Sequence, residues 1–146
     1  MKGTKGFTLI ELMMAVVIAA ILLSVGIPAF LTLSERTSVS TTSNEMLAAL
    51  LLARSEAVRQ ESNTTFTPSG NGWQVDTGVL NLLTHTVDSN SITISGNAVT
   101  YNSRGRAALN DTDAISISFN GEVKSRICLS LTGRPFVRKA EDGLCP

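Results

Sequence analysis

The chain has 146 residues, enough for one small globular domain together with an extended anchor. Its formal net charge is zero, which excludes a molecule whose whole surface attracts nucleic acid. Aromatic residues make up only 5% of the sequence, and Ser, Thr and Asn are frequent in its second half, so the composition favours a small β-rich domain with a modest core.

An apolar segment near the N-terminus is long enough to cross a membrane. Residues 12–23 read LMMAVVIAAILL, and the apolar character continues with few interruptions from Phe7 to about Leu33. As a helix, this stretch spans a hydrocarbon core of about 30 Å. Because Lys2 and Lys5 precede it, we expect a cytoplasmic N-terminus and an exported remainder.

One carboxylate, Glu11, lies at the cytoplasmic side of this apolar run. A carboxylate in lipid costs a few kcal/mol, so Glu11 should have a partner. The nearest plausible partner is a backbone amine four residues earlier, which is freed if the chain is cut before Phe7. That geometry is poor within one helix and good between axially staggered subunits, where the pair would also set the register.

Residues 5–12, KGFTLIEL, resemble the class III prepilin motif. In that motif a prepilin peptidase cuts after the glycine and methylates the new N-terminal phenylalanine. The resemblance implies cleavage between Gly6 and Phe7, N-methylation of Phe7 and a role for Glu11 in assembly. Pro28 lies where pilins commonly carry a helix-kinking proline, and a local bend or a melted turn is expected there because proline removes a helical hydrogen bond.

The helix should resume after Pro28 and continue to about Glu61. Its second half carries an apolar stripe at helical spacing, so one face should pack on a domain. The stripe consists of Met46, Leu50, Ala53 and Ala57, widened by Leu47, Leu51 and Val58. Residues 37–43, TSVSTTS, have poor helix propensity and are a predicted weak point.

From Asn63 onward the pattern is that of an antiparallel β structure. Residues 70–72, GNG, predict a hairpin turn before Trp73, and Asn120-Gly121 is a strong two-residue hairpin signal. Apolar residues alternate with polar ones in residues 91–94, 115–119 and 127–131. These signals predict a helix packed against one antiparallel sheet or a pair of sheets.

Further segments are similar to the GspH/FimT family of type IV pilin-like proteins. Leu47 and Leu50, followed by residues 53–58 (ARSEAV), resemble its helical signature. Residues 101–105 (YNSRG) resemble its mid-domain turn, and residues 127–134, with ICLS and TGR, its final strand and tail. The resemblance implies an α+β fold, in which a long N-terminal helix, membrane-spanning in its first half, packs on a small antiparallel β domain of two sheets.

The implied organisation has four parts. They are a leader peptide at residues 1–6, the transmembrane or filament-core half of the helix at 7–33, its amphipathic half at 34–62, and a periplasmic β domain with a disulfide-closed tail at 63–146. Such a protein would pass once through the inner membrane and later enter an extracellular pilus. Its partners would be the prepilin peptidase, the inner membrane and other pilins or pseudopilins.

Two cysteines, Cys128 and Cys145, lie near the C-terminus. Neither belongs to a C-x-x-C pair, and with one histidine in the chain there is no set of zinc ligands. An exported domain would oxidise them to a disulfide, which stabilises by roughly 3 kcal/mol on the chain-entropy model. The alternative is two unrelated buried thiols.

Enzymatic chemistry has little support. His85, the only histidine, lies in a polar THT context and is expected to be an ordinary surface residue, without a nucleophile–base arrangement around it. Asp111 and Asp113 predict a turn before the strand at 115–119, because a metal site needs more ligands. We expect no catalytic residues, metal or cofactor.

The basic tail is the surface feature with functional promise. The candidate DNA-binding residues are Arg134, Arg138 and Lys139, with Arg104 and Arg106 as an extension of the patch. Arginines on a constrained segment bind phosphates bidentately, and a few such contacts give weak, salt-sensitive, sequence-independent binding of double-stranded DNA.

Family members in naturally transformable bacteria carry a G-R-x-R tail that binds incoming DNA. This chain has Gly133 and Arg134 but places Phe136 at the second arginine position. In an extended segment, Phe136 and Arg138 point the same way as Arg134, so Arg138 could replace the missing second arginine from farther along the same face. The alternative is a solvated tail that packs against another pilin.

The sequence therefore predicts a minor type IV pilin, in or at the tip of a pilus, that supports assembly. Whether its basic tail binds DNA during natural transformation or is purely structural stays open. Two further hypotheses stay open. One is a pseudopilin of type II secretion, which serves protein export. The other is a dedicated DNA receptor whose binding is separable from assembly.

Overall fold

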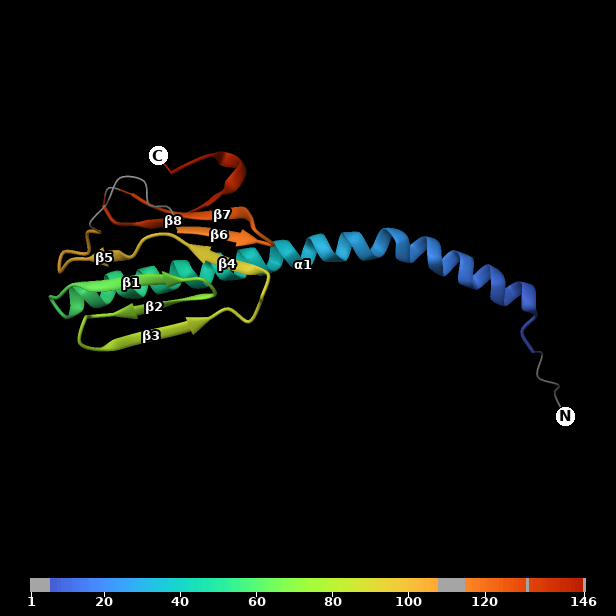
Figure 1. Ribbon diagram of the computed structural model, residues 1–146, viewed down its shortest axis with the longest axis horizontal. Coiled ribbons are helices and arrows are strands. Elements are labelled where there is room, and N and C mark those ends of the chain that lie inside the picture. The colour runs from blue at the N-terminus through green and yellow to red at the C-terminus, as the bar shows by residue number, and fades with distance from the viewer. Residues whose placement is uncertain (1–5, 108–114, 131, 146) are drawn as a thin grey trace. The chain divides into compact units, whose positions relative to one another are not determined.

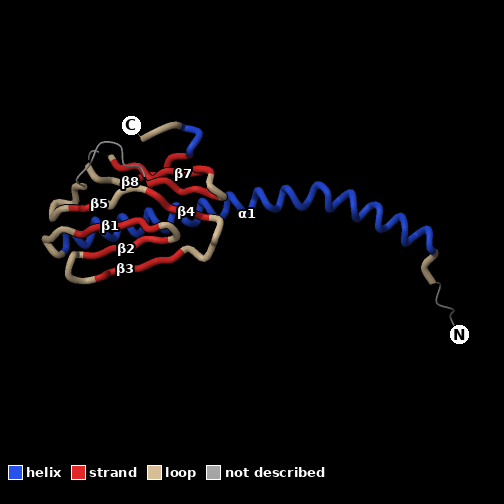
Figure 2. The backbone as a smooth tube through the Cα atoms, in the orientation of Figure 1, coloured by secondary structure: helices blue, strands red, loops and turns tan. Residues whose placement is uncertain are grey.

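The computed structural model describes residues 6–107, 115–130 and 132–145. Within these residues a long helix is followed by eight strands in two antiparallel sheets (Figures 1 and 2), which confirms the expected α+β fold. The elements are α1 (Leu9–Arg59), β1 (Thr64–Ser69), β2 (Gly72–Asp76), β3 (Asn81–Thr86), β4 (Ile92–Ser95), β5 (Val99–Tyr101), β6 (Ile115–Phe119), β7 (Glu122–Leu129), β8 (Pro135–Lys139) and the 3₁₀ helix η1 (Ala140–Asp142). Two compact units, Met1–Arg36 and Thr37–Pro146, make up the chain.

In the first unit, the apolar side chains of α1 are exposed. By length and composition α1 can cross a membrane, a test that a signal sequence also passes, and its most apolar 18-residue window is 0% buried. The hydroxyls of Ser24 and Thr32 donate to helix carbonyls at 2.7 and 3.0 Å. Such internal pairing is what a polar side chain requires in lipid.

The helix is continuous through Gly26 and Pro28. Of the two outcomes expected at the proline, a melted turn is therefore absent, and the ribbon is curved along this part (Figure 1). Proline removes one hydrogen bond, and a gentle curve absorbs that loss without ending the helix.

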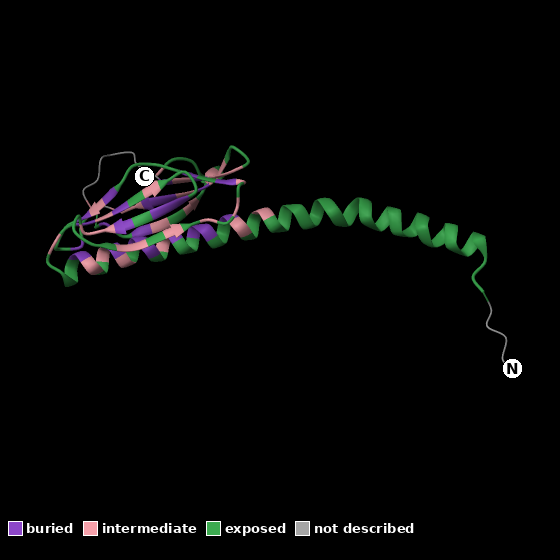
Figure 3. Cartoon of the chain, turned by 60° about the horizontal axis from the view of Figure 1, so that its bottom comes forward, coloured by how far each residue is buried: buried purple, intermediate pink, exposed green. Residues whose placement is uncertain are grey.

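In the second unit, one narrow face of α1 enters the core (Figure 3). Met46, Leu50 and Ala53 are 0% exposed, as the predicted stripe requires. Leu51 and Val58, expected to widen the stripe, are instead exposed at 45% and 50%. The buried stripe is therefore narrower than predicted.

The predicted weak point at residues 37–43 is helical throughout. Val39, Thr42 and Ser43 are buried, and the Ser43 hydroxyl donates to the Val39 carbonyl at 2.7 Å. The same hydroxyl lies 3.2 Å from the Ser125 hydroxyl on β7. Packing on the second sheet thus compensates for the poor helix propensity of this segment.

The first sheet has the order β3-β2-β1-β5. The predicted turn before Trp73 joins β1 to β2, with Gly70 and Asn71 at its tip. Phe66, Trp73 and Val75 fill the core side of this sheet.

The second sheet has the order β4-β6-β7-β8. Asn120 and Gly121 connect β6 to β7 with φ angles of 50° and 84°, as expected for a two-residue hairpin turn. Ile115, Ile117 and Ile127 point into the same core as the helix stripe.

A disulfide joins Cys128 on β7 to Cys145, with the two Cα atoms 5.6 Å apart. The expected pairing is therefore present, and the alternative of two free thiols is wrong. The bond closes the chain around β8 and η1.

Candidate nucleic-acid interface

Two turns with matching backbone hydrogen bonds carry three of the candidate arginines. Residues 102–106, NSRGR, follow β5, and residues 130–134, SLTGR, join β7 to β8. In each turn the backbone N–H of the first residue donates to the carbonyl of the fifth at 2.9 Å. The backbone N–H of the fourth, a glycine, donates back to the carbonyl of the first at 2.8 or 2.7 Å.

The side chain of the first residue completes each turn. Asn102 and Ser130 each accept a hydrogen bond, at 3.1 Å, from the backbone N–H of the arginine that ends the turn. The glycines have φ angles of +70° and +77°, a conformation that other residues adopt only at a cost. Arg106 and Arg134 therefore occupy equivalent positions of what we call the twin turns, residues 102–106 and 130–134.

The twin turns are in direct contact. A Cβ atom added to Gly133 would lie 2.8 Å from the Ala107 nitrogen and 3.0 Å from the Gly105 oxygen. Sequence alone could not establish whether Arg104 and Arg106 lie near Arg134, and this close backbone approach brings the two turns together.

Arg54, from α1, holds both turns. Its Nε donates to the Gly105 carbonyl at 2.9 Å, and its Nη2 donates to the Thr132 carbonyl at 3.4 Å. Sequence reasoning noted Arg54 only as a member of the helical signature. Its position in the sequence directly after Ala53 of the buried stripe was the feature that could have indicated a structural role.

Arg104, Arg106 and Arg134 are exposed residues of the twin turns. Among the residues that the structure describes, none of their guanidinium groups has a hydrogen-bond or ion-pair partner. Three unpaired guanidiniums on contacting turns can bind phosphate oxygens bidentately. Asp111 and Asp113, predicted to form a turn, lie outside the described residues.

The other two candidate cations are engaged. The Arg138 guanidinium donates to the backbone carbonyl of Asp142, in the segment 140–143. Lys139 pairs with Glu141 at 3.2 Å. Arg126, opposite Arg138 in the β7–β8 pairing, donates to two carbonyls of the same segment at 3.1 and 3.2 Å. Arg138 thus lies in an extended strand as expected, but its guanidinium fastens the C-terminal segment.

The N-terminal candidates lie around the start of α1. The Thr8 N–H donates to the Glu11 carboxylate at 3.4 Å, and the Glu11 N–H donates to the Thr8 hydroxyl at 3.3 Å. This is the reciprocal pattern of a capping box, whose T-x-x-E signal the sequence reasoning missed. Gly6 precedes the helix in an exposed position, and Phe7 is 80% exposed.

His85 is not the ordinary surface residue that was expected. It lies on β3, its ring stacks on Trp73 at a centroid distance of 4.2 Å, and its Nε2 lies 3.4 Å from a Glu45 carboxylate oxygen. No group of three or more His, Cys, Asp or Glu side chains in the described part of the chain could hold a metal ion.

Comparison with solved structures identifies the fold. Two crystal structures of the type IV minor pilin FimU of Pseudomonas aeruginosa match this chain. The first has a TM-score of 0.63 and 20% sequence identity, and the match covers 78% of this chain and 99% of that one. The second has a TM-score of 0.58, 21% identity and coverages of 73% and 99%. The fold is therefore that of a type IV pilin.

Family models narrow this class. The model described as type II transport protein GspH matches residues 42–133, and the prokaryotic N-terminal methylation motif matches residues 1–27. Because the first match covers more than half of the sequence, the chain belongs to the GspH family of type IV pilin-like proteins. No curated protein matches it in sequence.

Proposed function

We propose that this protein is a minor type IV pilin, carried in or at the tip of a pilus, which supports pilus assembly and binds double-stranded DNA without sequence specificity. The observation that carries the DNA-binding part is the set of three guanidiniums on the twin turns that have no partner in the described part of the chain. Membership of a structural pilin family supports the assembly part, and no catalytic step is proposed.

The proposed assembly mechanism begins at the leader. A prepilin peptidase cuts between Gly6 and Phe7 and methylates the new terminus, while the first half of α1 anchors the chain once across the inner membrane with its C-terminal domain in the periplasm. The freed amine then lies at the positive end of the helix dipole, where it needs an anion. Glu11 of an adjoining subunit supplies that anion, and the apolar helices, with their curve at Pro28, move from lipid into the filament core.

Substitution of Glu11 tests this mechanism. Since the capping box is local to one chain, Glu11→Gln keeps its hydrogen-bonding shape and removes only the charge. We expect Glu11→Gln and Glu11→Ala both to reduce incorporation into sheared filaments at least tenfold while membrane levels persist. Normal incorporation, or a mature chain that does not begin at Phe7, would contradict the mechanism.

The DNA-binding part makes a quantitative prediction. If Arg104, Arg106 and Arg134 each neutralise one phosphate, the logarithm of the binding constant should fall with the logarithm of salt concentration at a slope of about −3. Replacement of Arg106 and Arg134 by alanine should reduce the slope to about −1 and abolish the electrophoretic shift at moderate salt.

Matched variants in the fastened segment provide the control. Arg138→Ala and Lys139→Ala also remove two cations, but their side chains are engaged by the C-terminal segment, so DNA binding should change less than threefold. If these variants lose as much binding as the twin-turn variants, the interface has been placed on the wrong residues. Loss of DNA binding with normal piliation would mark a receptor function that is separable from assembly.

The second candidate function is a type II secretion pseudopilin, which the description of the matching family model favours. Deletion of the gene discriminates the two. A minor pilin predicts loss of pili and of transformation with normal protein export, whereas a pseudopilin predicts retention of exported proteins in the periplasm.

A further inference from the structure

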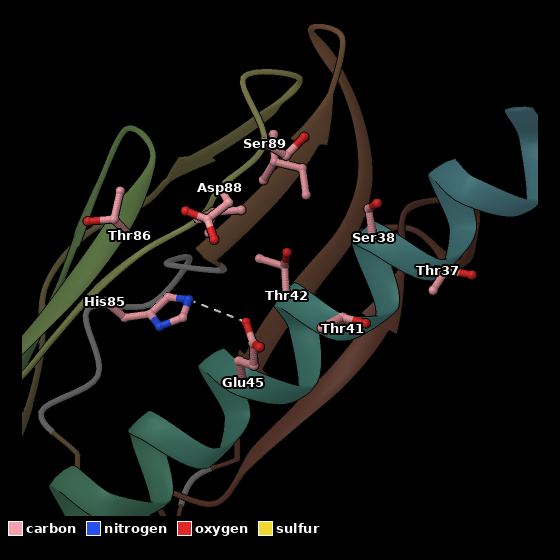
Figure 4. A pocket seen from close by; sticks show the side chains of 11 residues that line it. Thr37, Ser38, Thr41, Thr42, Glu45, His85, Thr86, Asp88 and Ser89 are labelled. Carbon is pink, nitrogen blue, oxygen red and sulfur yellow. Dashed lines mark ion pairs between the residues drawn. The ribbon is translucent and has the colours of Figure 1, made fainter.

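The outer edge of β3 is open for pairing with another strand. β3 ends the first sheet, and among the described residues only β2 pairs with it (Figures 1 and 2). On the core side of β3, the His85 ring points toward Glu45 of α1, and its Nε2 lies 3.4 Å from the carboxylate (Figure 4). The helix thus contacts the inner face of the strand, while the edge in the plane of the sheet has no paired strand in the described part of the chain.

Two residues of β3 present their backbone groups to this open edge. The Val87 N–H donates to the Asn71 carbonyl at 2.7 Å, which fixes the alternation of hydrogen bonds between β2 and β3. In an antiparallel pair every second residue exchanges hydrogen bonds with its partner strand, so His85 bonds to β2 while Thr84 and Thr86 point their N–H and C=O groups outward. No described residue forms a hydrogen bond with these outward backbone groups.

The other three sheet edges are occupied or protected. On β4, which ends the second sheet, the Ile94 N–H donates to the Gly70 carbonyl at 2.7 Å. β5 has three residues, and its Tyr101 forms a bridge with Ala107. β8 (Pro135–Lys139) begins with a proline and ends with two cations, which are residue types that block edge pairing. β3, in contrast, has six residues and contains no proline, lysine, arginine or acid.

An exposed apolar turn lies directly before β3. The Leu80 N–H donates to the Thr77 hydroxyl at 3.2 Å, and the Thr77 N–H donates to the Leu80 carbonyl at 3.0 Å, so the turn at 77–80 is fixed at both ends. Val79 in this turn is 98% exposed, and Leu80 is 59% exposed. A partner that covers these side chains gains free energy from the burial of apolar surface. The edge therefore offers hydrogen bonds along a strand and an apolar contact at one end.

We propose that the outer edge of β3 pairs with an extended strand of an adjoining pilin subunit, a protein other than this chain, and that an apolar residue of this partner covers Val79 and Leu80. The inference rests on the proposed filament role, because a pilin carried at low copy has other subunits as its neighbours. In strand addition the main-chain hydrogen bonds supply affinity and the side-chain contacts supply selectivity. The added strand continues the first sheet beyond β3, so two subunits share one sheet.

A proline at the edge tests this pairing without breaking the sheet. Thr84→Pro removes an outward N–H, and no hydrogen bond to β2 is lost. Thr84→Ala keeps this N–H and removes the side chain, whose hydroxyl accepts a hydrogen bond from the Asn81 side-chain amide at 2.9 Å. The two variants therefore separate the contribution of the backbone from that of the side chain.

A proline on another edge strand is the matched control. The Ser130 N–H donates to the Arg134 carbonyl, and the same alternation turns the N–H of Val137 on β8 away from β7. Val137→Pro thus removes an outward N–H from an edge at which no partner is proposed.

Incorporation into filaments is the measurement. Each variant is produced with its assembly machinery, and the ratio of chain in sheared filaments to chain in membranes is determined. We expect Thr84→Pro to lower this ratio at least about fivefold, because a backbone hydrogen bond is lost and the proline ring obstructs the incoming strand. Thr84→Ala and Val137→Pro should stay within about twofold of the unmodified chain. Equal membrane levels and an intact Cys128–Cys145 bond show that each variant is folded.

The outcomes separate this inference from the proposed function. If the unmodified chain never enters filaments, the proposed function fails. If it enters and Thr84→Pro enters equally well, the inference on β3 fails alone. It also fails if Thr84→Ala or Val137→Pro lowers incorporation as much as Thr84→Pro, because the effect then does not come from the backbone of β3.

Photo-cross-linking identifies the strand that pairs with β3. A benzophenone amino acid replaces Thr86, sheared filaments are irradiated, and the cross-linked peptides are sequenced by mass spectrometry. We expect a peptide from a strand of another pilin subunit, and addition of Thr84→Pro should abolish this product. A product between two copies of this chain, a product from a helix, or no product at all would overturn the proposal.

Discussion

At the scale of single residues, Tyr101 shows how burial changes both stability and titration. Its side chain is 0% exposed, and its hydroxyl has no hydrogen-bond partner among the described residues. Burial raises the pKa of Tyr101 to about 12, an effect that the nearby positive charge of Arg54 opposes more weakly. The fold thus favours the neutral phenol.

Stability should therefore fall in alkaline solution. An unfolded tyrosine loses its proton near pH 10, whereas Tyr101 keeps its proton until about pH 12. Between these values the unfolded state binds fewer protons, so the free energy of unfolding decreases as pH rises. Tyr101→Phe should unfold with a free energy within about 1 kcal/mol of the original at pH 7 and lose this contribution to the alkaline decrease. Urea unfolding at pH 7 and at a pH between about 10 and 12 measures both effects. If the free energy of unfolding of Tyr101→Phe falls as steeply with alkaline pH as that of the original protein, the effect does not come from Tyr101.

Arg54 is the residue that positions the interface. Arg54→Lys keeps the positive charge, but a lysine ammonium lacks the planar guanidinium that donates to one carbonyl in each turn. The twin turns should therefore lose the hydrogen bonds that hold both of them to α1. We expect DNA affinity to fall about threefold to tenfold, from an estimated loss of roughly one hydrogen bond. Arg59→Lys, on an exposed ion pair with Glu56, is the matched control and should leave affinity unchanged.

At the scale of elements, short sequence patterns predicted the hairpin turn and the buried face of the helix, but they did not predict contacts between segments that are distant in the sequence. The Asn120-Gly121 turn could be predicted because both residues accept positive φ, and the helix stripe because Met46, Leu50 and Ala53 repeat at helical spacing. These signals depend on a few neighbouring residues. The approach of the twin turns depends on how two sheets are placed around one helix, which no local pattern records.

The glycine of the second twin turn offers a test at this scale. Gly133→Ala combines positive φ with a Cβ atom only 2.8 Å from the Ala107 nitrogen. Gly78→Ala shares the strained conformation, with φ +80°, but has nothing within 4 Å. We expect Gly78→Ala to cost about 1 kcal/mol and Gly133→Ala about 2–3 kcal/mol of unfolding free energy. Only Gly133→Ala should also weaken DNA binding, and equal costs would show that the close approach is unimportant.

At the scale of the whole molecule, the C-terminal segment is fastened twice. The Cys128–Cys145 bond closes it covalently, and Arg126 and Arg138 hold its carbonyls. Replacement of both cysteines by serine should lower the free energy of unfolding by about 3 kcal/mol, since the loop of the unfolded chain is then open. Reduction of the unmodified protein should give the same loss. A smaller effect would mean that the arginine contacts hold the segment by themselves.

The contacts of His85 also depend on the whole fold. A THT triplet carries no sign that Trp73 lies beneath it or that Glu45 lies opposite, because one contact comes from strand pairing and the other from the helix. The composition of the sequence was enough to predict a cationic tail. It was not enough to predict which cations have partners, because Arg138 and Lys139 contact residues that follow them in the chain.

The Cys128–Cys145 bond has a consequence for limited proteolysis. Because the bond encloses β8 and η1, a single cut by a protease between the two cysteines would leave both fragments covalently joined. The nicked protein would then migrate as one band on a denaturing gel without reductant, and it would separate into two pieces only after reduction.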